Sequence, residues 1–264
     1  MTGNPSGRPP AGRQIRGAES PRKVLQVLLR FTQDRPHATI SELASEIGVP
    51  LSTCYRYVAL LREVGLLEEG ERATYHVTPQ IMHVARAAQV SNDLTRIARQ
   101  FMQEVAAAVN ETVMLMQAYG GSAVCIESIE STRPVRFAFE SGHTLPLGDG
   151  ATGKLLLAYM SEQQRAARLD ERAATDPKFA RRRRALEKDL PQIAEQGWAT
   201  SLAEVEEGVW ACSAAIRDGD SVPGALTVAG PAFRISEKTR ANVRDRLLQA
   251  TAGVSKMLAV YREP

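Results

Sequence analysis

The stretch that most constrains the fold is LSTCYRYVALLREVGLL, residues 51–67, which combines a helical apolar period with polar side chains in its first turns. Its apolar residues recur at the spacing i, i+3, i+4 and i+7, so they share one side of a helix. At about 100° per residue, the polar groups near its N-terminus fall on the opposite side. The apolar set is Cys54, Tyr57, Val58 and Leu61, and the opposite set is Ser52, Arg56, Ala59 and Glu63, flanked by Thr53 and Tyr55. We therefore expect a helix that packs on one side and presents hydrogen-bonding groups on the other.

Two shorter helical patterns precede this stretch. Ser20, followed by a proline, is expected to cap a first helix, which a break at residues 35–36 ends. Thr39 then begins a second helix, because Glu42 three residues later completes a capping box, and Gly48 ends it. The buried side of this second helix is expected to hold Ile40, Leu43, Ala44 and Ile47. Two short helices joined by a turn that contains glycine predict a helix-turn-helix, whose second helix enters the major groove.

A short hairpin is expected directly after the third helix. Residues 66–67 and 74–77 have the composition of two strands joined around Gly70. A hairpin in this place is the wing of a winged helix, and Arg72 near its tip is suited to contact the sugar-phosphate backbone or the minor groove. The series predicts binding of double-stranded DNA, with Arg56 as the candidate for a guanine contact. The expected DNA-binding residues are Ser52, Thr53, Tyr55, Arg56 and Arg72.

The rest of the chain changes from a helical to a strand period at Glu111. Before this point, residues 78–90 predict a short helix and residues 95–109 a longer one that connects two domains. The predicted strands are TVMLMQAY, SAVCIESI, PVRFAF, VWACSAAI and GALTVAG, and the predicted helices span 154–159, 162–169, 184–195 and 236–261. Hairpin-linked strands with helices between and after them predict an antiparallel sheet with helical layers, an α+β fold. The expected parts are a disordered basic tail (1–18), a winged helix-turn-helix domain (19–90), a linker helix (91–110) and a second domain (111–264).

The distribution of charge supports a nucleic-acid partner for the first domain. The net charge is +3, and residues 1–90 hold 11 Lys and Arg against 8 Asp and Glu, whereas residues 91–264 hold 22 against 22. The excess cation therefore lies in the first third of the chain, next to the predicted recognition helix. In the tail, Arg8, Arg13 and Arg16 are suited to loose phosphate contacts, although a tail without a role is the simpler interpretation.

Several features predict a cytoplasmic protein without a membrane segment. No apolar run approaches the roughly 18 residues that span a bilayer, and the N-terminal residues lack the apolar stretch of a secretory signal. Cys54, Cys125 and Cys212 are few and widely spaced, which fits reduced thiols rather than a disulfide framework. The four histidines have no metal-ligand spacing, so neither a metal nor a cofactor is expected. The run RRRR at 181–184 is expected to be a solvated helix face, and Trp198 and Trp210 to be core residues.

Residues 148–154, GDGATGK, raise an enzymatic alternative. They satisfy the nucleotide-binding pattern G-x-x-x-x-G-K, but Leu155 stands where Ser or Thr would hold Mg²⁺. The alternative function is a nucleotide-using enzyme with an accessory winged helix and a site at Gly148–Lys154, and a scaffold that binds proteins through its winged helix is a third. No other catalytic pattern is found in the sequence. Because a helix follows the glycines, backbone N–H groups from Gly150 to Gly153 are suited to bind a smaller anion.

Four motifs in order resemble those of the IclR family of bacterial transcriptional regulators over residues 20–261. The resemblance lies in STCYRYVALLREVGLL, LPLGDGATGKLLLAY, EVEEGVWACSAAI with Glu204 and Gly208, and GALTVAGPAFRIS with Gly230-Pro231. It implies an N-terminal winged helix, a linker helix and a C-terminal GAF-like effector domain. It also implies dimers or tetramers that bind palindromic operators and respond to small organic acids or aromatic catabolites, so the chain would be a repressor or activator and not an enzyme.

The resemblance also implies which residues form the effector pocket. The matching positions are Ala151, Thr152, Ser201, Ala211, Thr227 and Ala229. Some members of the family carry an acidic residue at the position of Ser201, a thiol at that of Ala211 and a hydroxyl at that of Ala229. These departures make the expected pocket less polar, and they favour a ligand that is larger or more apolar than a two-carbon acid.

Overall fold

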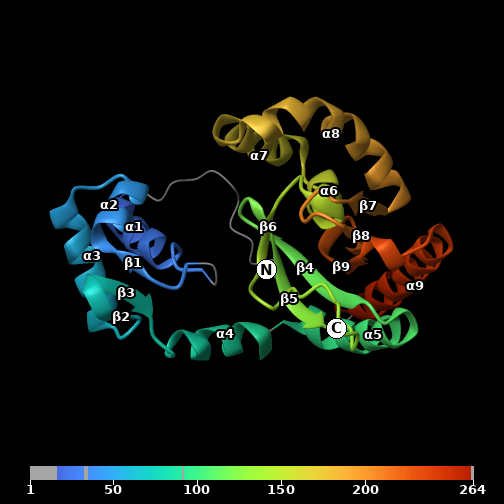
Figure 1. Cartoon of the computed structure of the whole chain (residues 1–264), viewed down its shortest axis with the longest axis horizontal. Helices are drawn as coiled ribbons and strands as arrows, with labels where there is room; N and C mark the ends of the chain where they lie inside the picture. The colour runs from blue at the N-terminus through green and yellow to red at the C-terminus, as the bar shows by residue number, and fades with distance from the viewer. Residues whose placement is uncertain (1–16, 33–34, 91, 263–264) are drawn as a thin grey trace, which may run out of the picture. The chain divides into compact units, whose positions relative to one another are not determined.

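The computed structural model describes residues 17–32, 35–90 and 92–262, and the chain divides into two compact units, Met1–Ala88 and Gln89–Pro264 (Figure 1). The first unit contains short helices and a small sheet, and the second is an α+β domain. Most of the predicted basic tail, including Arg8, Arg13 and Arg16, lies outside the described residues.

The first unit is a winged helix, as predicted. Three helices, α1 (Glu19–Leu28), α2 (Ile40–Ile47) and α3 (Leu51–Glu63), are followed by a hairpin of β2 (Leu67–Glu69) and β3 (Thr74–Val77) with a 3-10 turn, Glu71–Ala73, at its tip. A two-residue strand, β1 (Ala38–Thr39), pairs with β3 to give the sheet order β1-β3-β2. The sequence did not predict β1, because two residues are too few to show a strand period.

The second helix has the predicted ends and the predicted buried face. The Thr39 hydroxyl accepts from the Glu42 amide at 3.3 Å, and the Glu42 carboxylate accepts from the Thr39 amide at 2.7 Å, which is a complete capping box. Gly48 ends the helix with a φ of 65°, a left-handed conformation that favours glycine. The apolar sides of α2 and α3 bury Ile40, Leu43, Ala44, Ile47, Cys54, Val58 and Leu61 in one core.

The first helix begins earlier than its sequence suggests. It begins at Glu19 with Ala18 as its N-cap, so the prediction that Ser20 caps the helix is wrong. Ser20 lies inside the first turn, and its hydroxyl donates to the Tyr57 hydroxyl on α3 at 3.2 Å. The following Pro21 is tolerated because amides in a first helical turn have no intrahelical acceptor. Ser20 therefore connects two helices instead of capping one.

The second unit is built on one antiparallel sheet of the order β6-β5-β4-β9-β8-β7. Its strands are β4 (Thr112–Tyr119), β5 (Ser122–Ile129), β6 (Thr144–Pro146), β7 (Trp198–Leu202), β8 (Val209–Asp218) and β9 (Ser221–Pro231). β4 pairs with β9 in the middle of the sheet, with Met114 opposite Thr227. The expected α+β class with an antiparallel sheet and helical layers is confirmed.

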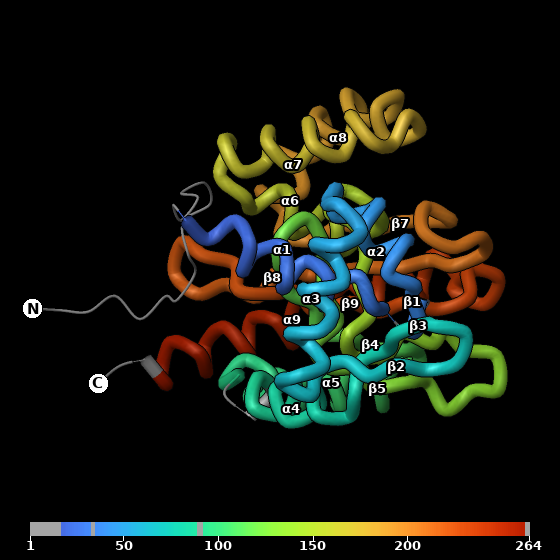
Figure 2. The backbone as a smooth tube through the Cα atoms, turned by 90° about the vertical axis from the view of Figure 1, so that its left-hand side faces the viewer, coloured from blue at the N-terminus to red at the C-terminus, as the bar shows by residue number. Residues whose placement is uncertain are grey.

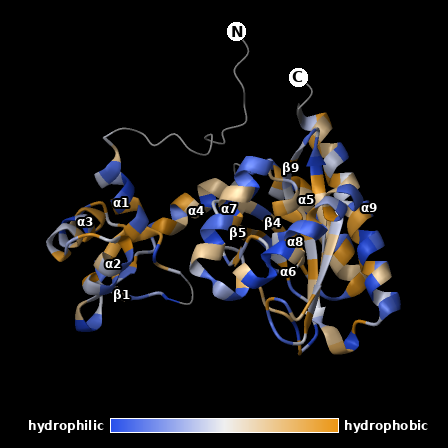
Figure 3. Cartoon of the chain, turned by 90° about the horizontal axis from the view of Figure 1, so that it is seen from above, coloured by the Kyte–Doolittle hydropathy of each residue, from blue (hydrophilic) through white to orange (hydrophobic). Residues whose placement is uncertain are grey.

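Helices cover both faces of this sheet (Figures 1 and 2). On one face lie α5 (Asp93–Val109) and α9 (Glu237–Arg262), and on the other α6 (Gly150–Ala158) and α8 (Pro177–Gln196), with α7 (Glu162–Thr175) packed on α8. Because side chains alternate along a strand, Leu115 of β4 joins the α5–α9 core while Met114 and Met116 join the α6–α8 core. Figure 3 shows the hydrophilic colour on the outer turns of α8 and α9.

The chain enters the second unit through two consecutive helices. α4 (Ile81–Val90) begins three residues after the predicted start, and Asn92 caps α5 by accepting from the Thr95 amide at 3.3 Å. The helix predicted as a linker, α5, contributes Leu94, Ile97, Ala98, Met102 and Val105 to the core that it shares with α9. It is therefore an integral part of the second unit.

The predicted strand PVRFAF, residues 134–139, is not a strand. The segment has no ladder partner, and β6 occupies the edge beside β5 instead. Pro134 lacks an amide donor, and the Phe137 carbonyl accepts a hydrogen bond from the Thr112 hydroxyl rather than from a strand. The alternation in the sequence reflects burial of Phe137 and Phe139 against the α6–α8 core, not pairing in the sheet.

Candidate functional site

The outward side of α3 holds the predicted DNA-contacting side chains together. Ser52, Tyr55 and Arg56 are exposed, with Tyr55 at 54%, and Thr53 is half-buried beside them. The helix has Pro50 at its N-cap without a side-chain cap, and its first turn faces away from the apolar core. A helix N-terminus with unoccupied amides and neighbouring hydroxyls suits contact with phosphate oxygens or base edges.

The wing presents the fifth predicted residue. Arg72 is exposed at the hairpin tip with a φ of 55°, and its neighbour Ala73 also has a positive φ, 56°. A hydrogen bond of 2.8 Å from the Gly70 amide to the Thr74 carbonyl closes this turn. An ion pair of 3.3 Å between Arg62 at the end of α3 and Glu69 of β2 holds the wing against α3.

Ion pairing separates the arginines of the first unit into two groups. Within residues 17–32 and 35–88, Arg22, Arg30, Arg35 and Arg62 each pair with a glutamate. Arg56 and Arg72 have no acidic partner in the described structure, and neither has Arg86 on α4. Unpaired guanidinium groups keep their full capacity for phosphate, and two of these three arginines, Arg56 and Arg72, are ones that the sequence predicts to contact DNA.

In the second unit, the six residues predicted for the effector pocket line one cavity. About 440 Å³ of space not filled by protein atoms, which includes open solvent, lies between the sheet and the N-terminus of α6. Two of the six lie on α6, one on β7, one on β8 and two on β9, so segments far apart in sequence converge here. The lining comprises Met114, Met116, Phe137, Phe139, Leu145, Gly150, Ala151, Thr152, Ser201, Val205, Glu206, Val209, Ala211, Thr227 and Ala229.

One end of the cavity is a set of unoccupied hydrogen-bond donors. α6 begins at Gly150, four residues before the predicted start, and its N-cap residue Asp149 makes no side-chain cap. The Gly153 amide donates to the Asp149 carbonyl at 3.0 Å, whereas those of Gly150, Ala151 and Thr152 have no acceptor among the described residues. Ser201, a residue that is 8% exposed, lines the same space, and its hydroxyl is also without a hydrogen bond in the described structure. Buried donors without partners are costly, so this end suits an anionic or carbonyl oxygen.

A chain of hydroxyls runs from the cavity into the sheet. The hydroxyls of Thr152 and Thr227 are 2.7 Å apart, and Thr227 donates to Ser213 at 2.9 Å. All three residues are buried. Because a hydroxyl both donates and accepts, Thr152 at the cavity end of this chain can offer either role to a bound molecule.

The opposite wall is apolar and aromatic, and sequence reasoning missed it. Met114 and Met116 point from β4 into the cavity, and the rings of Phe137 and Phe139 stack at 5.7 Å with an interplanar angle of 14°. The ring of Phe139 in turn meets that of His143 edge-on at 5.1 Å. The alternation in PVRFAF was the available signal, but it was interpreted as a strand rather than as a cavity wall.

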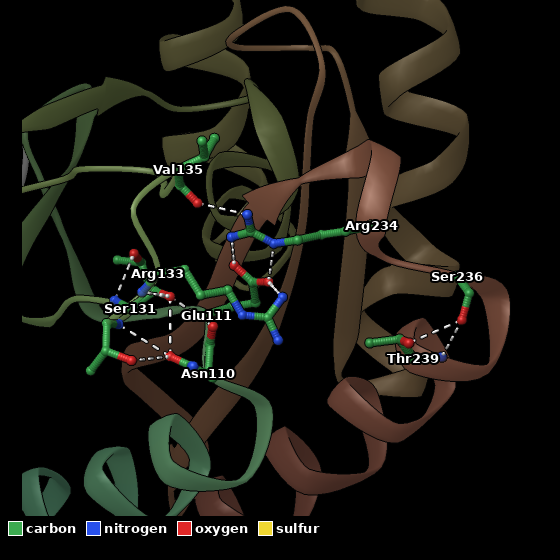
Figure 4. A network of polar contacts seen from close by, with 10 residues as sticks. Asn110, Glu111, Ser131, Arg133, Val135, Arg234, Ser236 and Thr239 are labelled. Atoms are coloured by element: carbon green, nitrogen blue, oxygen red, sulfur yellow. Dashed lines mark hydrogen bonds and ion pairs between the residues drawn. The ribbon is translucent and has the colours of Figure 1, made fainter.

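A buried ion-pair network anchors this wall (Figure 4). The Glu111 carboxylate, 3% exposed, accepts two hydrogen bonds of 2.7 Å from Arg234 and lies 3.4 Å from Arg133. Arg234 also donates to the Val135 carbonyl at 2.6 Å, so it fixes the segment that leads to Phe137. A Cβ on Gly230 would lie 2.4 Å from the Glu111 carboxylate. The Gly230-Pro231 motif therefore leaves the space that the buried carboxylate needs.

The G-x-x-x-x-G-K segment is used structurally. The Lys154 ammonium donates to the Glu204 carboxylate at 2.6 Å and to the Thr200 carbonyl at 2.8 Å, so it holds the end of β7 and the loop that follows. Leu155 is fully buried in the α6–α8 core. Two residues from separate family motifs, Lys154 and Glu204, are thus ion-pair partners, which the sequence alone does not reveal.

Other groups capable of chemistry are buried or already paired. Cys54, Cys125 and Cys212 are free and buried thiols, and burial raises the pKa of Cys125 and of Cys212 to about 12. No group of three or more potential metal ligands occurs in the part of the chain that the structure describes. In the run RRRR, Arg182 pairs with Asp149 and Arg183 with Asp170 and Glu187, so the cluster is not simply a solvated face. Trp210 is buried in the α5–α9 core, with Trp198 packed against it.

A winged helix together with an antiparallel-sheet domain that carries a cavity is the architecture of a DNA-binding regulator with a sensor domain. Family models agree: residues 20–71 match the IclR helix-turn-helix domain, and residues 86–256 match the C-terminal domain of the bacterial transcriptional regulator IclR. The chain belongs to the IclR family of bacterial transcriptional regulators. Among the helices that the structure describes, none has the length and apolarity to cross a bilayer.

Named relatives and solved structures agree with this assignment. The chain is 25% identical over 240 residues to the regulator KipR of Bacillus subtilis, covering 88% of this chain and 94% of KipR. It is 24% identical over 264 residues to the repressor AllR of Escherichia coli, covering 98% and 97% of the two chains. An IclR-family regulator from Brucella abortus superimposes with a TM-score of 0.82 at 21% identity, over 90% of this chain and 92% of that one. A homologue from Microbacterium hydrocarbonoxydans, solved with 4-hydroxybenzoate, gives 0.69 at 22% identity, over 91% and 99%.

Proposed function

We propose that this regulator binds a palindromic operator as a dimer or tetramer and changes its occupancy of DNA when a small organic acid enters the α6 cavity. The parts would be the DNA-binding domain at 19–90, a connecting segment at 91–110, whose helix α5 packs on the effector domain, and the effector domain at 111–264. The observation that carries the ligand part is the cavity with three unoccupied amides of α6, the unpaired Ser201 hydroxyl and an apolar wall.

The DNA contacts are assigned to five side chains. Ser52, Thr53 and Tyr55 read base edges or fix α3 against the backbone, Arg56 contacts a guanine, and Arg72 on the wing contacts the backbone or the minor groove. The exposure of Ser52, Tyr55, Arg56 and Arg72 supports this assignment, as does the lack of acidic partners for both arginines in the described structure. One winged helix contacts too few bases for genomic selectivity, so two copies on two half-sites are required.

The effector is an acid with an aromatic or otherwise apolar body. Its carboxylate accepts from the amides of Gly150 to Thr152 and from Ser201, and its body packs against Met114 and Met116 and the stacked phenylalanines. Ala211 and Ala229 line the cavity without adding polar groups, which favours a body larger and more apolar than that of a two-carbon acid. The 4-hydroxybenzoate bound by the homologue from Microbacterium hydrocarbonoxydans is a ligand of this chemical class.

The nucleotide-using alternative has little physical support. Lys154 would have to leave Glu204 and the Thr200 carbonyl in order to reach a phosphate, and Leu155 is buried. The relatives are named transcriptional regulators, which is a non-enzymatic class.

Two measurements on the full-length protein test the proposal. Retention of a palindromic duplex from the operator region should fall steeply with salt and be lost in Arg56→Ala, but not in the control Arg22→Ala, whose arginine pairs with Glu19. In a thermal-shift titration, 4-hydroxybenzoate and benzoate should raise the melting temperature of the wild type, and glyoxylate should raise it less. None of these three acids should stabilise the Ser201→Val variant. A protein that ignores every duplex and co-purifies with a protein partner would instead be a scaffold, and indifference of its stability to all acids would refute the ligand assignment.

A further inference from the structure

Asp149 has the backbone of a helix cap but does not cap. Its φ of −103° and ψ of 142° are the extended values of an N-cap residue, and aspartate is among the residues that cap most strongly. Asp176, in a similar conformation at the start of α8, accepts from the amides of Lys178 at 2.9 Å and of Phe179 at 3.0 Å. Thr39 and Ser161 cap α2 and α7 in the same way. The α6 N-terminus is left without a cap although a suitable side chain is in place.

Two arginines account for this exception. Arg172 of α7 donates to one carboxylate oxygen of Asp149, and Arg182 of α8 pairs with the other. Arg172 also donates to the Leu147 carbonyl at 2.9 Å, and Arg182 to the Gly148 carbonyl at 3.4 Å. Both oxygens of Asp149 are thus directed away from α6, toward the α7–α8 side.

The arginines are themselves held by one aromatic ring. The guanidinium carbons of Arg172 and Arg182 lie 4.2 Å and 5.0 Å from the centre of the Phe179 ring, which is fully buried. Cation–π contacts of this kind add to the ion pairs and restrict the guanidinium groups. The Asp149 side chain is 14% exposed, so it has little access to water as a competing partner.

The position of this carboxylate decides whether an anion can approach α6. If Asp149 rotated into the cap position, it would accept from Ala151 or Thr152, the amides left unoccupied in the cavity. It would also place a negative charge where a ligand carboxylate would bind, which disfavours a second anion. The Ser201 hydroxyl, which lines the same cavity and has no hydrogen bond in the described structure, is free for a ligand oxygen, and this supports a site that a ligand rather than Asp149 completes.

We propose that Arg172 and Arg182 are positioning residues that hold Asp149 off the α6 N-terminus and so keep its amides open for an acidic effector. The ligand part rests on the proposed function, whereas the restraint on Asp149 can be tested without a ligand. Neither arginine lines the cavity, so neither contacts the effector.

The ligand-free test measures amide hydrogen exchange by NMR in the full-length protein. In Arg172→Gln/Arg182→Gln, Asp149 is expected to cap α6 and to slow exchange of the Ala151 or Thr152 amide about tenfold. Adding Asp149→Ala should restore fast exchange, which a merely structural role of the arginines would not predict. The matched control is Arg183→Gln, because Arg183 lies on the same helix but pairs with Asp170 and Glu187. Unchanged exchange in the folded double variant would overturn the proposal.

The ligand test uses 4-hydroxybenzoate and isothermal titration calorimetry. The double variant should bind about tenfold more weakly than the wild type, and the triple variant with Asp149→Ala should regain the affinity. If the double variant unfolds, Arg182→Gln alone replaces it in both tests, since this side chain is 39% exposed, with an expected effect of about threefold. Weaker binding that Asp149→Ala does not restore would refute the positioning role. Failure of the wild type to bind any acid, with the exchange result as expected, would refute the ligand assignment alone.

Discussion

Removal of Arg234 is expected to destabilise the second unit strongly. In Arg234→Ala, the Glu111 carboxylate would remain buried with only Arg133, 3.4 Å away, as a cationic partner. Two charged hydrogen bonds of 2.7 Å would be lost, together with the bond that holds the Val135 carbonyl. Breaking a buried ion pair from one side typically costs about 3–5 kcal/mol, because the remaining charge is left uncompensated. Arg133 offsets part of this, so we expect a loss of about 3 kcal/mol.

The magnitude can be checked against two further variants. Glu111→Gln in the Arg234→Ala background removes the stranded charge and should recover about 1 kcal/mol, since the remaining cost is that of a neutral buried amide. Arg136→Ala is the matched control, because Arg136 pairs with Glu130 at 2.5 Å on the surface, where such a pair contributes less than about 1 kcal/mol.

Urea denaturation followed by tryptophan fluorescence is the appropriate assay. Both tryptophans of the chain, Trp198 and Trp210, belong to the second unit, so their signal reports its unfolding. With a slope of roughly 2–3 kcal/mol per molar urea, a loss of about 3 kcal/mol lowers the midpoint by about 1 M or more. If Arg234→Ala and Arg136→Ala gave the same midpoint, the argument that the buried carboxylate anchors the cavity wall would fail.

Three other predictions follow from local geometry. Gly153→Ala should destabilise the second unit by more than about 2 kcal/mol in the same assay, because its Cβ would lie 2.7 Å from the Pro146 carbonyl oxygen and 3.0 Å from the Gly148 nitrogen, both backbone atoms. The thiols of Cys125 and Cys212, whose pKa burial raises to about 12, should not react with iodoacetamide at pH 8 until urea unfolds the protein; rapid labelling of the native state would contradict this. Hydrogen bonds from Thr39 lower the pKa of Glu42 below its ordinary value of 4.5. The ionised Glu42 carboxylate therefore stabilises the fold fully above pH 4.5, and this contribution is lost as the pH falls through the lowered pKa. Glu42→Gln should therefore flatten the acid limb of the stability curve, and an unchanged limb would count against the capping box.

The winged helix was predictable because its determinants are local. The capping box of Thr39 and Glu42, the left-handed Gly48 and the apolar period of α3 lie within a few residues of one another, and each has a direct backbone consequence. The start of α1 was mispredicted because Ser20 looks like a cap locally, whereas its hydroxyl bonds to Tyr57, 37 residues away. That partner is a property of the packed fold.

The cavity was predictable only in part for the same reason. Motif positions identified Ser201 and Thr227, but the aromatic wall depends on Arg234 holding a segment about a hundred residues earlier in the chain. The alternation in residues 134–139 is compatible with either a strand or a wall, and a pattern of period two does not decide between them. The orientation of Asp149 departs further from what the sequence predicts, because local rules predict that its side chain caps α6, whereas it makes no cap in the structure.

The anchoring of the cavity wall also bears on how a bound acid could act at a distance. The hydroxyl of Ser131, at the start of the wall segment, donates to the backbone carbonyl of Asn110 at 2.8 Å, and the Asn110 side chain accepts from the Thr132 amide at 3.1 Å. Asn110 is the left-handed C-cap of α5, with a φ of 48°. Displacement of Phe137 by a ligand would therefore strain the hydrogen bonds of Asn110 at the C-terminal end of α5, the helix that follows α4 in the chain. Such a ligand changes DNA occupancy only if it binds the DNA-bound and the free protein with unequal affinity, however tightly it binds.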